Sequence, residues 1–207
     1  IFINIKKMKI KILHVITGLG TGGAEMMLYK LLNNIEKNKF EFVVLSLLNY
    51  NSLEKKIKKT STVVLHLNIN NFFLFIPSLM YIFYYLIKWK PNIIQGWMYH
   101  ANLASTLLSF LFFLKTPVIW NIRQSIYDLS YEKKLTSILI KFLSKLSNYP
   151  VYIIYNSFIG SIQHEKIGYS KIKTKIIPNG FDTLNFNIRT KETYFFRKKY
   201  NIDISSI

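Results

Sequence analysis

The chain has 207 residues, half of them hydrophobic, which is enough for one folded domain and argues against a disordered chain. It contains no cysteine, so disulfides, thiol catalysis and cysteine-ligated zinc are excluded. Its formal net charge of +18 is not gathered into an arginine-rich arm or a dense lysine cluster, so we expect no nucleic-acid partner; AT-rich codons or attraction to anionic lipid account for the charge.

Strand and helix patterns alternate along the whole chain. We expect strands over residues 9–17, 40–48, 61–67, 91–97, 117–123 and 150–157, with a short last strand in 171–180. We expect helices over residues 24–35, 77–88, 101–114, 132–147 and 158–167. Because the strands are apolar on both faces, the pattern predicts an α/β domain with a Rossmann-like, doubly wound parallel sheet.

Residues 72–89 form an apolar segment almost long enough to cross a bilayer. Pro77 stands where a first helical turn would begin, and a polar pair, Asn70 and Asn71, precedes it. A helix that begins at Pro77 has only about a dozen residues before Lys88, too few to span at about 1.5 Å per residue. We therefore expect a buried or membrane-grazing helix here.

Ligands of such sheets bind at the carboxyl ends of the strands, so the residues that follow each strand are the candidates. These are residues 18–23, 95–100, 123–125, 156–157 and 179–180. Gly18, Gly20 and Gly23 match the G-x-G-x-x-G pattern of dinucleotide-binding proteins. That function also needs an acidic residue at the end of the second strand, but the sequence there is Ser-Leu-Leu, at residues 46–48.

The glycine loop still predicts an anion cradle without the acidic residue. Gly20, Gly22 and Gly23 allow the backbone to approach a ligand, and the free N–H groups of the following helix favour a phosphate or sugar oxygen. Glu25 lies in the first helical turn. Two interpretations remain for Glu25: a hydrogen bond to a sugar hydroxyl, or a favourable interaction with the helix dipole.

Five motifs that follow strands occur together in this order: "GLGTGGAE", "PNIIQGWMYHANL", "VIWNIRQS", "NSFIGSIQHEKIGY" and "KIIPNGFD". As an ordered set they resemble the N-terminal half of retaining GT-B glycosyltransferases of family GT4, over residues 8–186. The resemblance implies two Rossmann-like domains with the active site between them. The N-terminal domain mainly holds the acceptor, and the C-terminal domain holds most of the nucleotide-sugar.

The resemblance also implies a domain organisation. We expect residues 1–7 to be an upstream or disordered extension, 8–186 the acceptor-side domain, and 187–207 the start of an interdomain linker, with the C-terminal donor domain absent. The implied donor is a UDP- or GDP-sugar and the implied acceptor a lipid-linked or saccharide hydroxyl in surface polysaccharide synthesis. No metal or other cofactor is expected, and the chain alone is expected to be inactive.

Individual residues receive roles by the same resemblance. His100 resembles the family's active-site histidine, which faces the transferred sugar; the alternative is a histidine that caps the following helix. Arg123 ends a strand and can hold a phosphate or carboxylate through two bonds, or form a structural salt bridge. Asn156, beside Ser157, favours a helix cap, and Asn179 favours a turn into the linker with a secondary contact to the cleft.

The predicted helix 132–147 carries lysines away from its apolar stripe, namely Lys133, Lys134, Lys141 and Lys145. A basic amphipathic helix can lie on an anionic membrane, although such lysines also serve as a plain solvated face. With a lipid-linked acceptor, the chain is expected to work peripherally at the inner face of the cytoplasmic membrane.

Two other classes of protein stay open at this point. One is an NAD-binding Rossmann oxidoreductase or epimerase, which the missing acidic residue disfavours. The other is a non-catalytic, membrane-associated subunit of a split transferase.

Overall fold

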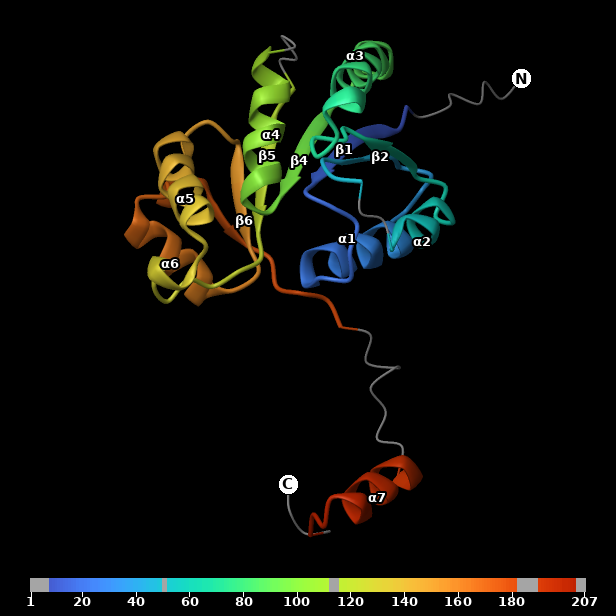
Figure 1. The fold of residues 1–207 in the computed structure, drawn as a ribbon, viewed down its shortest axis with the longest axis vertical. Helices are drawn as coiled ribbons and strands as arrows, with labels where there is room; N and C mark the ends of the chain where they lie inside the picture. Colours follow the sequence, from blue (N-terminus) through green and yellow to red (C-terminus); the bar gives the residue numbers. More distant parts are fainter. Residues whose placement is uncertain (1–7, 50–51, 112–115, 182–189, 204–207) are drawn as a thin grey trace, which may run out of the picture.

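The computed structural model describes residues 8–49, 52–111, 116–181 and 190–203, and within them seven strands form one parallel sheet (Figure 1). The strand order is β3–β2–β1–β4–β5–β6–β7. Strands β2 and β3 are therefore added on one side of β1, and strands β4 to β7 are added on the other side. The strands are β1 (Ile10–Ile16), β2 (Phe40–Ser46), β3 (Val63–His66), β4 (Ile93–Trp97), β5 (Val118–Ile122), β6 (Tyr152–Tyr155) and β7 (Thr174–Ile176). The predicted doubly wound, Rossmann-like sheet is confirmed.

Helices connect the strands on both faces of the sheet. They are α1 (Gly23–Asn34), α2 (Glu54–Lys58), α3 (Phe72–Trp89), α4 (Met98–Leu111), α5 (Lys134–Leu146) and α6 (Phe158–Ile167), with short 3-10 turns η1 (Leu129–Tyr131) and η2 (Lys171–Lys173). A further helix, α7 (Thr190–Lys199), lies apart from the sheet in Figure 1. The sequence analysis predicted neither α2 nor α7. The proposed extension, residues 1–7, lies outside the described residues.

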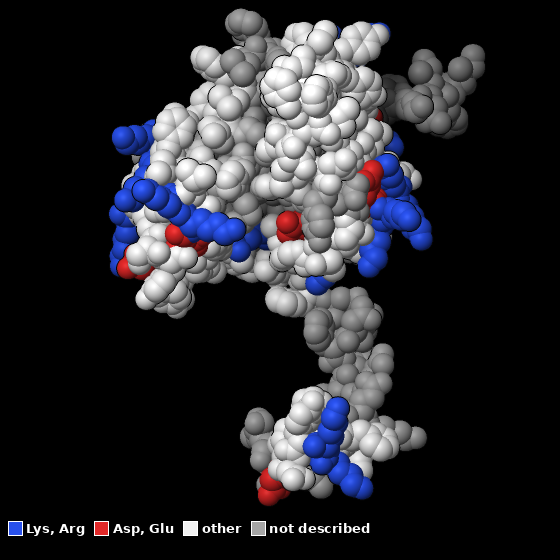
Figure 2. Space-filling view, in the orientation of Figure 1, with Lys and Arg blue, Asp and Glu red and all other residues white. Residues whose placement is uncertain are grey.

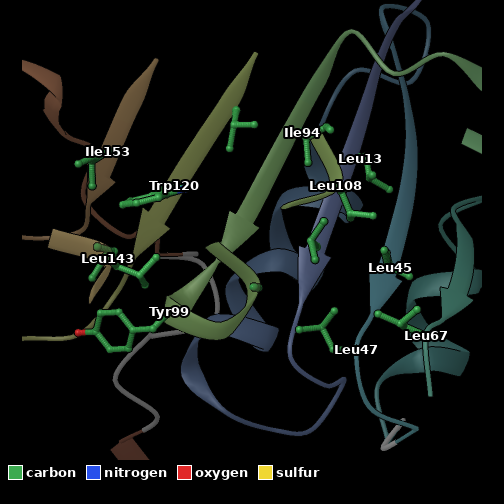
Figure 3. Close-up of a cluster of buried hydrophobic side chains, with 14 of the residues drawn as sticks. Leu13, Leu45, Leu47, Leu67, Ile94, Tyr99, Leu108, Trp120, Leu143 and Ile153 are labelled. Atoms are coloured by element: carbon green, nitrogen blue, oxygen red, sulfur yellow. The ribbon is translucent and has the colours of Figure 1, made fainter. Parts of the chain in front are cut away.

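One large hydrophobic core lies between the sheet and helices α3 to α6. Apolar side chains from alternate strand positions point toward the helices, as Leu13, Ile94, Trp120 and Ile153 do in Figure 3. The helices contribute buried residues to the same core, such as Leu86, Leu108, Ile140 and Leu143. Each of these strands therefore has one face sealed by this helical layer.

The opposite face of the sheet is covered only in part by the described helices. Leu28 and Leu32 of α1 and Ile57 of α2 pack on β1, β2 and the end of β4, forming a second, smaller core. Further along this face, Gln95 of β4 and Ile154 of β6 instead line a groove. The two faces of the sheet are thus unequally covered.

Helix α3 begins five residues earlier than the sequence suggested. The side chain of Asn71 accepts hydrogen bonds from the N–H groups of Phe73 and Leu74, and this cap starts the helix at Phe72. Pro77 therefore lies inside the helix, where it leaves the carbonyl of the exposed Phe73 without its helical donor. The expected start at Pro77 was wrong because the stronger signal was the cap.

By length and composition alone, α3 is able to cross a membrane. In the structure one stripe of it packs on the sheet, through Ile82, Leu86 and Trp89. The indole N–H of Trp89 also donates to the carboxylate of Glu41 at the start of β2. Helix α3 is therefore part of the domain's own helical layer, and most of its remaining surface is exposed.

Helix α5 turns a different face inward than predicted. The sequence pattern predicts a stripe of Leu135, Ile138, Leu139, Phe142 and Leu146. Leu139 and Leu146 do pack against the core, but Leu135, Ile138 and Phe142 are exposed, Leu135 by 79%. Ile140 and Leu143 are buried in their place. Because more than half of the circumference of α5 is apolar, helical periodicity alone could not determine which side meets the sheet.

Strand β4 passes directly into α4 without a connecting loop. Met98, the first residue of α4, has a φ of 68°, a left-handed conformation that is uncommon for a residue other than glycine. The end of β4 also lies very close to the first turns of α4, and this requires Gly96. A Cβ there would lie 2.6 Å from Asn102 Oδ1 and 2.7 Å from the carbonyl oxygen of Ala101.

We expect Gly96→Ala to lower the free energy of unfolding by about 1–3 kcal/mol, because the added methyl group meets backbone that cannot move aside. Gly23→Ala is the matched control, since a Cβ at Gly23 has no atom within 4 Å. Urea unfolding of both variants measures the difference. Equal stability of the two variants would contradict this account of the β4–α4 junction.

Candidate functional site

A cavity of about 310 Å³ lies at the carboxyl edge of the sheet, where the strand order reverses. Its walls come from the ends of β1 and β4, the start of α1 and the residues that follow β5. The lining residues are Ile16, Thr17, Gly23, Ala24, Glu25, Trp97, Met98, Arg123 and Gln124. Open α/β sheets bind their ligands at this kind of switch point.

The glycine loop supplies the first wall of the cavity. Helix α1 begins at Gly23 after Gly22, with no side-chain cap, so the N–H groups of its first turn are free to meet an anion. Glu25 is the third residue of α1, and its Oε2 comes so close to Gly22 that a Cβ there would be 2.5 Å away. Glu25 therefore lies at the helix N-terminus, where the dipole favours it, and also lines the cavity.

Arg123 forms another part of the wall, and its partners in the described residues are neutral. Its Nη1 donates to Asn121 Oδ1 at 3.1 Å, its Nη2 donates to Asn179 Oδ1, and its backbone N–H reaches Met98 Sδ at 3.3 Å. The guanidinium also lies 5.4 Å from the centre of the Trp97 ring. These contacts fix the guanidinium without neutralising it.

The charge of Arg123 is thus left without a carboxylate in the part of the chain that the structure describes. No ion pair there includes Arg123, and its Nε is a buried donor without a partner. Half-burial lowers the pKa of Arg123 below its ordinary value, although a guanidinium stays protonated in proteins. The expected alternative of a structural salt bridge is not seen among the described residues, and an anionic ligand would meet a guanidinium that has no ion pair there.

Trp97 is held in place by a buried histidine of β1. The indole N–H of Trp97 donates to His14 Nδ1 at 3.2 Å, and the His14 ring stacks on Phe42. Burial lowers the pKa of His14 to about 3, so the ring is neutral and Nδ1 can accept. His14 therefore orients the aromatic ring that lies against Arg123.

A larger groove of about 980 Å³ shares Trp97 and Arg123 with the cavity. It runs along α1 and the partly uncovered face of β4, β5 and β6. Residues 177–181 close one side of it, with Lys30 of α1 lying 5.9 Å from the centre of the Phe181 ring. The motif "PNGFD" thus returns to the site, and Asn179 contacts Arg123 directly rather than serving only as a turn.

The structure brings together only some of the predicted site residues. Glu25 and Gly23 line the cavity with Arg123, Gly22 stands beside it as the cap position of α1, and Gly20 is buried in the loop. His100 is exposed in the first turn of α4, two residues past Met98, and lines neither the cavity nor the groove. It lies inside the helix, because α4 begins at Met98 and not after His100.

The predicted residues of the C-terminal part have more varied surroundings. Asn156 is partly buried and lines neither hollow, while its neighbour Ser157 caps α6 by accepting from Gly160 N at 3.0 Å, as predicted. The four lysines are exposed on α5 or directly before it: Lys133, Lys134, Lys141 and Lys145. The described residues hold no group of three or more potential metal-ligating side chains, and metal-free chemistry remains a prediction.

Sequence reasoning missed the residues that position Arg123. Asn121 and His14 are polar side chains inside otherwise apolar strand runs, "VIWNI" and "IKILHVI", and both are buried. A polar residue in a buried strand needs a partner, and this signal could have identified them. Trp97 gave no such signal, because an aromatic residue at the end of a strand is common in hydrophobic cores.

The model of the family described as Glycosyltransferase Family 4 matches residues 21–184, which include Gly22 and Gly23 of the glycine loop, Arg123 and Asn179. The chain belongs to Glycosyltransferase Family 4. No curated protein matches it. The rival expectation of an NAD-binding protein gains no support from the site, since β2 ends at Ser46, whose hydroxyl donates to the carbonyl of Leu48.

Solved glycosyltransferases share the fold of this family member. HepE of Anabaena, in complex with UDP, matches with a TM-score of 0.69 and 16% identity over 93% of this chain and 50% of its own. The lipopolysaccharide outer core galactosyltransferase WaaB matches with 0.59 and 16%, over 84% and 46%. A glycosyltransferase from Rickettsia africae gives 0.56 and 17%, over 95% and 51%. The chain has the Rossmann-like fold of GT-B glycosyltransferases and spans about half their length.

The buried His14 predicts that this family member loses stability in acid. Its pKa is about 3 in the folded chain and ordinarily 6.5, so the unfolded chain binds more protons as the pH falls below about 6.5. The free energy of unfolding should then fall by about 1.4 kcal/mol per pH unit from this group alone. His164, whose pKa burial also lowers, adds in the same direction.

His14→Gln tests this contribution, because it removes the titrating ring and keeps an oxygen that can accept from Trp97. Urea unfolding at a series of pH values from 7.5 to 4.5 should show little difference in slope near pH 7.5 and, below about pH 5.5, a slope smaller than that of the unchanged chain by about 1.4 kcal/mol per pH unit. Identical slopes would mean that His14 does not titrate on unfolding in this range.

Proposed function

We propose that the chain is the N-terminal, acceptor-side domain of a glycosyltransferase of surface polysaccharide synthesis. It would help to move a hexose or N-acetylhexosamine from a UDP- or GDP-sugar to a lipid-linked or saccharide hydroxyl. Membership of Glycosyltransferase Family 4 supports transfer of a sugar. The complexes of HepE with UDP and with UDP-glucose support a nucleotide-sugar donor, and the role of WaaB in lipopolysaccharide suggests the polysaccharide context.

The observation that carries the proposal is the guanidinium of Arg123, without an ion pair among the described residues, in the same cavity as the uncapped N-terminus of α1. In sugar transfer the bond between the anomeric carbon and the diphosphate breaks, and negative charge grows on the leaving phosphate. Positive groups that are already in position stabilise this charge without reorganising. Arg123 and the N–H groups from Gly23 onward face one cavity, so they are suited to receive that anion.

The rest of the reaction follows from the proposed family chemistry. The acceptor oxygen forms the new bond to the anomeric carbon with retention of configuration, and its proton leaves with the departing diphosphate. Glu25 would accept a hydrogen bond from a sugar hydroxyl. His100 would face the transferred sugar from its exposed place at the start of α4, and Asn156 would lie at the cleft.

A direct test is the binding of UDP to the 207-residue chain by calorimetry, with GDP and NAD⁺ titrated alongside. We expect UDP or GDP to bind and Arg123→Gln to weaken the binding about tenfold or more, since a charge-assisted contact to phosphate is lost. Arg197→Gln is the matched control, because Arg197 belongs to α7 and lines neither the cavity nor the groove. It removes the same charge and should leave the affinity unchanged.

Two results would overturn the proposed donor site. If Arg123→Gln and Arg197→Gln weaken nucleotide binding equally, the loss of affinity comes from the change of net charge and not from a contact at the cavity. Binding of NAD⁺ in preference to both nucleoside diphosphates would point instead to the oxidoreductase class.

We further propose that transfer requires a second domain to hold most of the donor. The 207-residue chain incubated with UDP-glucose should bind the nucleotide weakly and release no UDP in a coupled assay, with glucose or a polyprenyl phosphate as acceptor. Release of UDP that Arg123→Gln abolishes would show instead that this chain is catalytically sufficient.

A further inference from the structure

Helix α3 exposes an apolar surface that a helix on a soluble domain does not ordinarily carry. Only one stripe of α3 packs on the sheet, yet its outward side chains are also apolar, with Phe73 exposed by 87% and Met80 by 67%. The other exposed members are Phe72, Leu74, Ile76, Tyr81, Phe83, Tyr84 and Ile87. Such a contiguous exposed patch marks an interaction site.

The neighbouring helices extend this surface. Helices α3, α4 and α5 pack into the same core, so they lie on the same face of the sheet. Helix α4 adds Leu107 and Phe110, and α5 adds Leu135, Ile138 and Phe142. We call these fourteen exposed side chains the α3–α5 surface. In Figure 2 its α3 part is seen as a broad, mostly white area in the upper part of the view.

The charges on these helices are all positive. Residues 72–89, 98–111 and 134–146 contain no Asp or Glu. On α5 the exposed Lys134, Lys141 and Lys145 alternate with the exposed apolar residues of the α3–α5 surface. Lysines interleaved with bulky apolar residues characterise helices that lie in the plane of an anionic bilayer.

These features favour lipid over a second copy of the chain. A symmetric dimer through the α3–α5 surface would bring the lysines of both α5 helices toward one interface that has no acidic residue of its own helices to pair with. Aromatic side chains that end in a hydroxyl, such as Tyr81 and Tyr84, suit the boundary between headgroups and acyl chains. Since Trp89 and Ile82 fix α3 to the sheet, the helix would lie on the membrane and not cross it.

We propose that the α3–α5 surface docks on an anionic lipid bilayer, with the exposed side of α3 in the headgroup region and the α5 lysines against lipid phosphates. The apolar membrane contact then lies mainly on α3, and the lysines of α5 supply the electrostatic attraction to the anionic lipid. The inference rests on the exposed surface alone and is independent of sugar transfer.

Sedimentation of the 207-residue chain with vesicles tests the apolar half of the proposal. We expect binding to vesicles of phosphatidylcholine with phosphatidylglycerol and weaker binding to phosphatidylcholine alone. Phe73→Glu combined with Met80→Glu should reduce binding about tenfold or more. Glu at position 73 suits the first turn of α3, so the fold should persist, and thermal unfolding checks this.

Matched controls separate the surface from general effects. Ile172→Glu changes a side chain exposed by 90% on η2, outside the three helices, and should leave binding as it was. Lys141→Glu with Lys145→Glu should weaken binding to the anionic vesicles about tenfold or more. Lys55→Glu with Lys56→Glu on α2 makes the same change of net charge on the other face of the sheet and should have little effect.

Several results would overturn the proposal. They are absence of binding to either kind of vesicle, unchanged binding of the α3 variant, and equal losses from the two lysine pairs. A dimer in solution that Phe73→Glu disperses would assign the surface to a second copy. If the double α3 variant melts early, Met80→Glu alone replaces it. Titration with UDP on the same variants shows whether the proposed donor site is intact, so the two proposals fail separately.

Discussion

The arrangement of the candidate site depends on a positive charge that the described fold holds but does not neutralise. Arg123 is half-buried, and the groups that orient it are two amide oxygens, a thioether and an aromatic ring. Burying a guanidinium costs free energy unless its donors are satisfied; the amide oxygens of Asn121 and Asn179 accept from Nη1 and Nη2, while Nε has no partner among the described residues. The cavity therefore holds a guanidinium that no salt bridge among the described residues neutralises, together with the carboxylate of Glu25 in the same wall.

This geometry is produced by convergence at the switch point of a parallel sheet. The ends of β1, β4 and β5 meet there, and the start of α1 and residues 177–181 complete the walls. The strands are mostly apolar, with His14, Gln95 and Asn121 as polar residues inside them, and the chain becomes more polar beyond their carboxyl ends. The buried parts hold the edges in register, and the residues just beyond them are free to serve a ligand.

The two faces of the sheet differ in a way that matters for function. One face is sealed by four helices, whose outer side is rich in aromatic residues and lysine. The other is covered by described helices only near β1, β2 and the end of β4, which leaves the groove beside Arg123. A ligand or a further domain can be received on the second side while the first side is free for a different contact.

The sequence by itself determined the order of the strands and of helices α1 and α3 to α6, the parallel sheet and the glycine-rich start of α1. These follow from local periodicity and from backbone chemistry that few residues can supply. It also determined that no acidic residue ends β2. Tertiary structure alone decided which sides of α3 and α5 are buried, because both helices are apolar around most of their circumference. It alone paired Arg123 with Asn179, 56 residues away, and Trp97 with His14, 83 residues away, since such contacts depend on which strands become neighbours in the sheet.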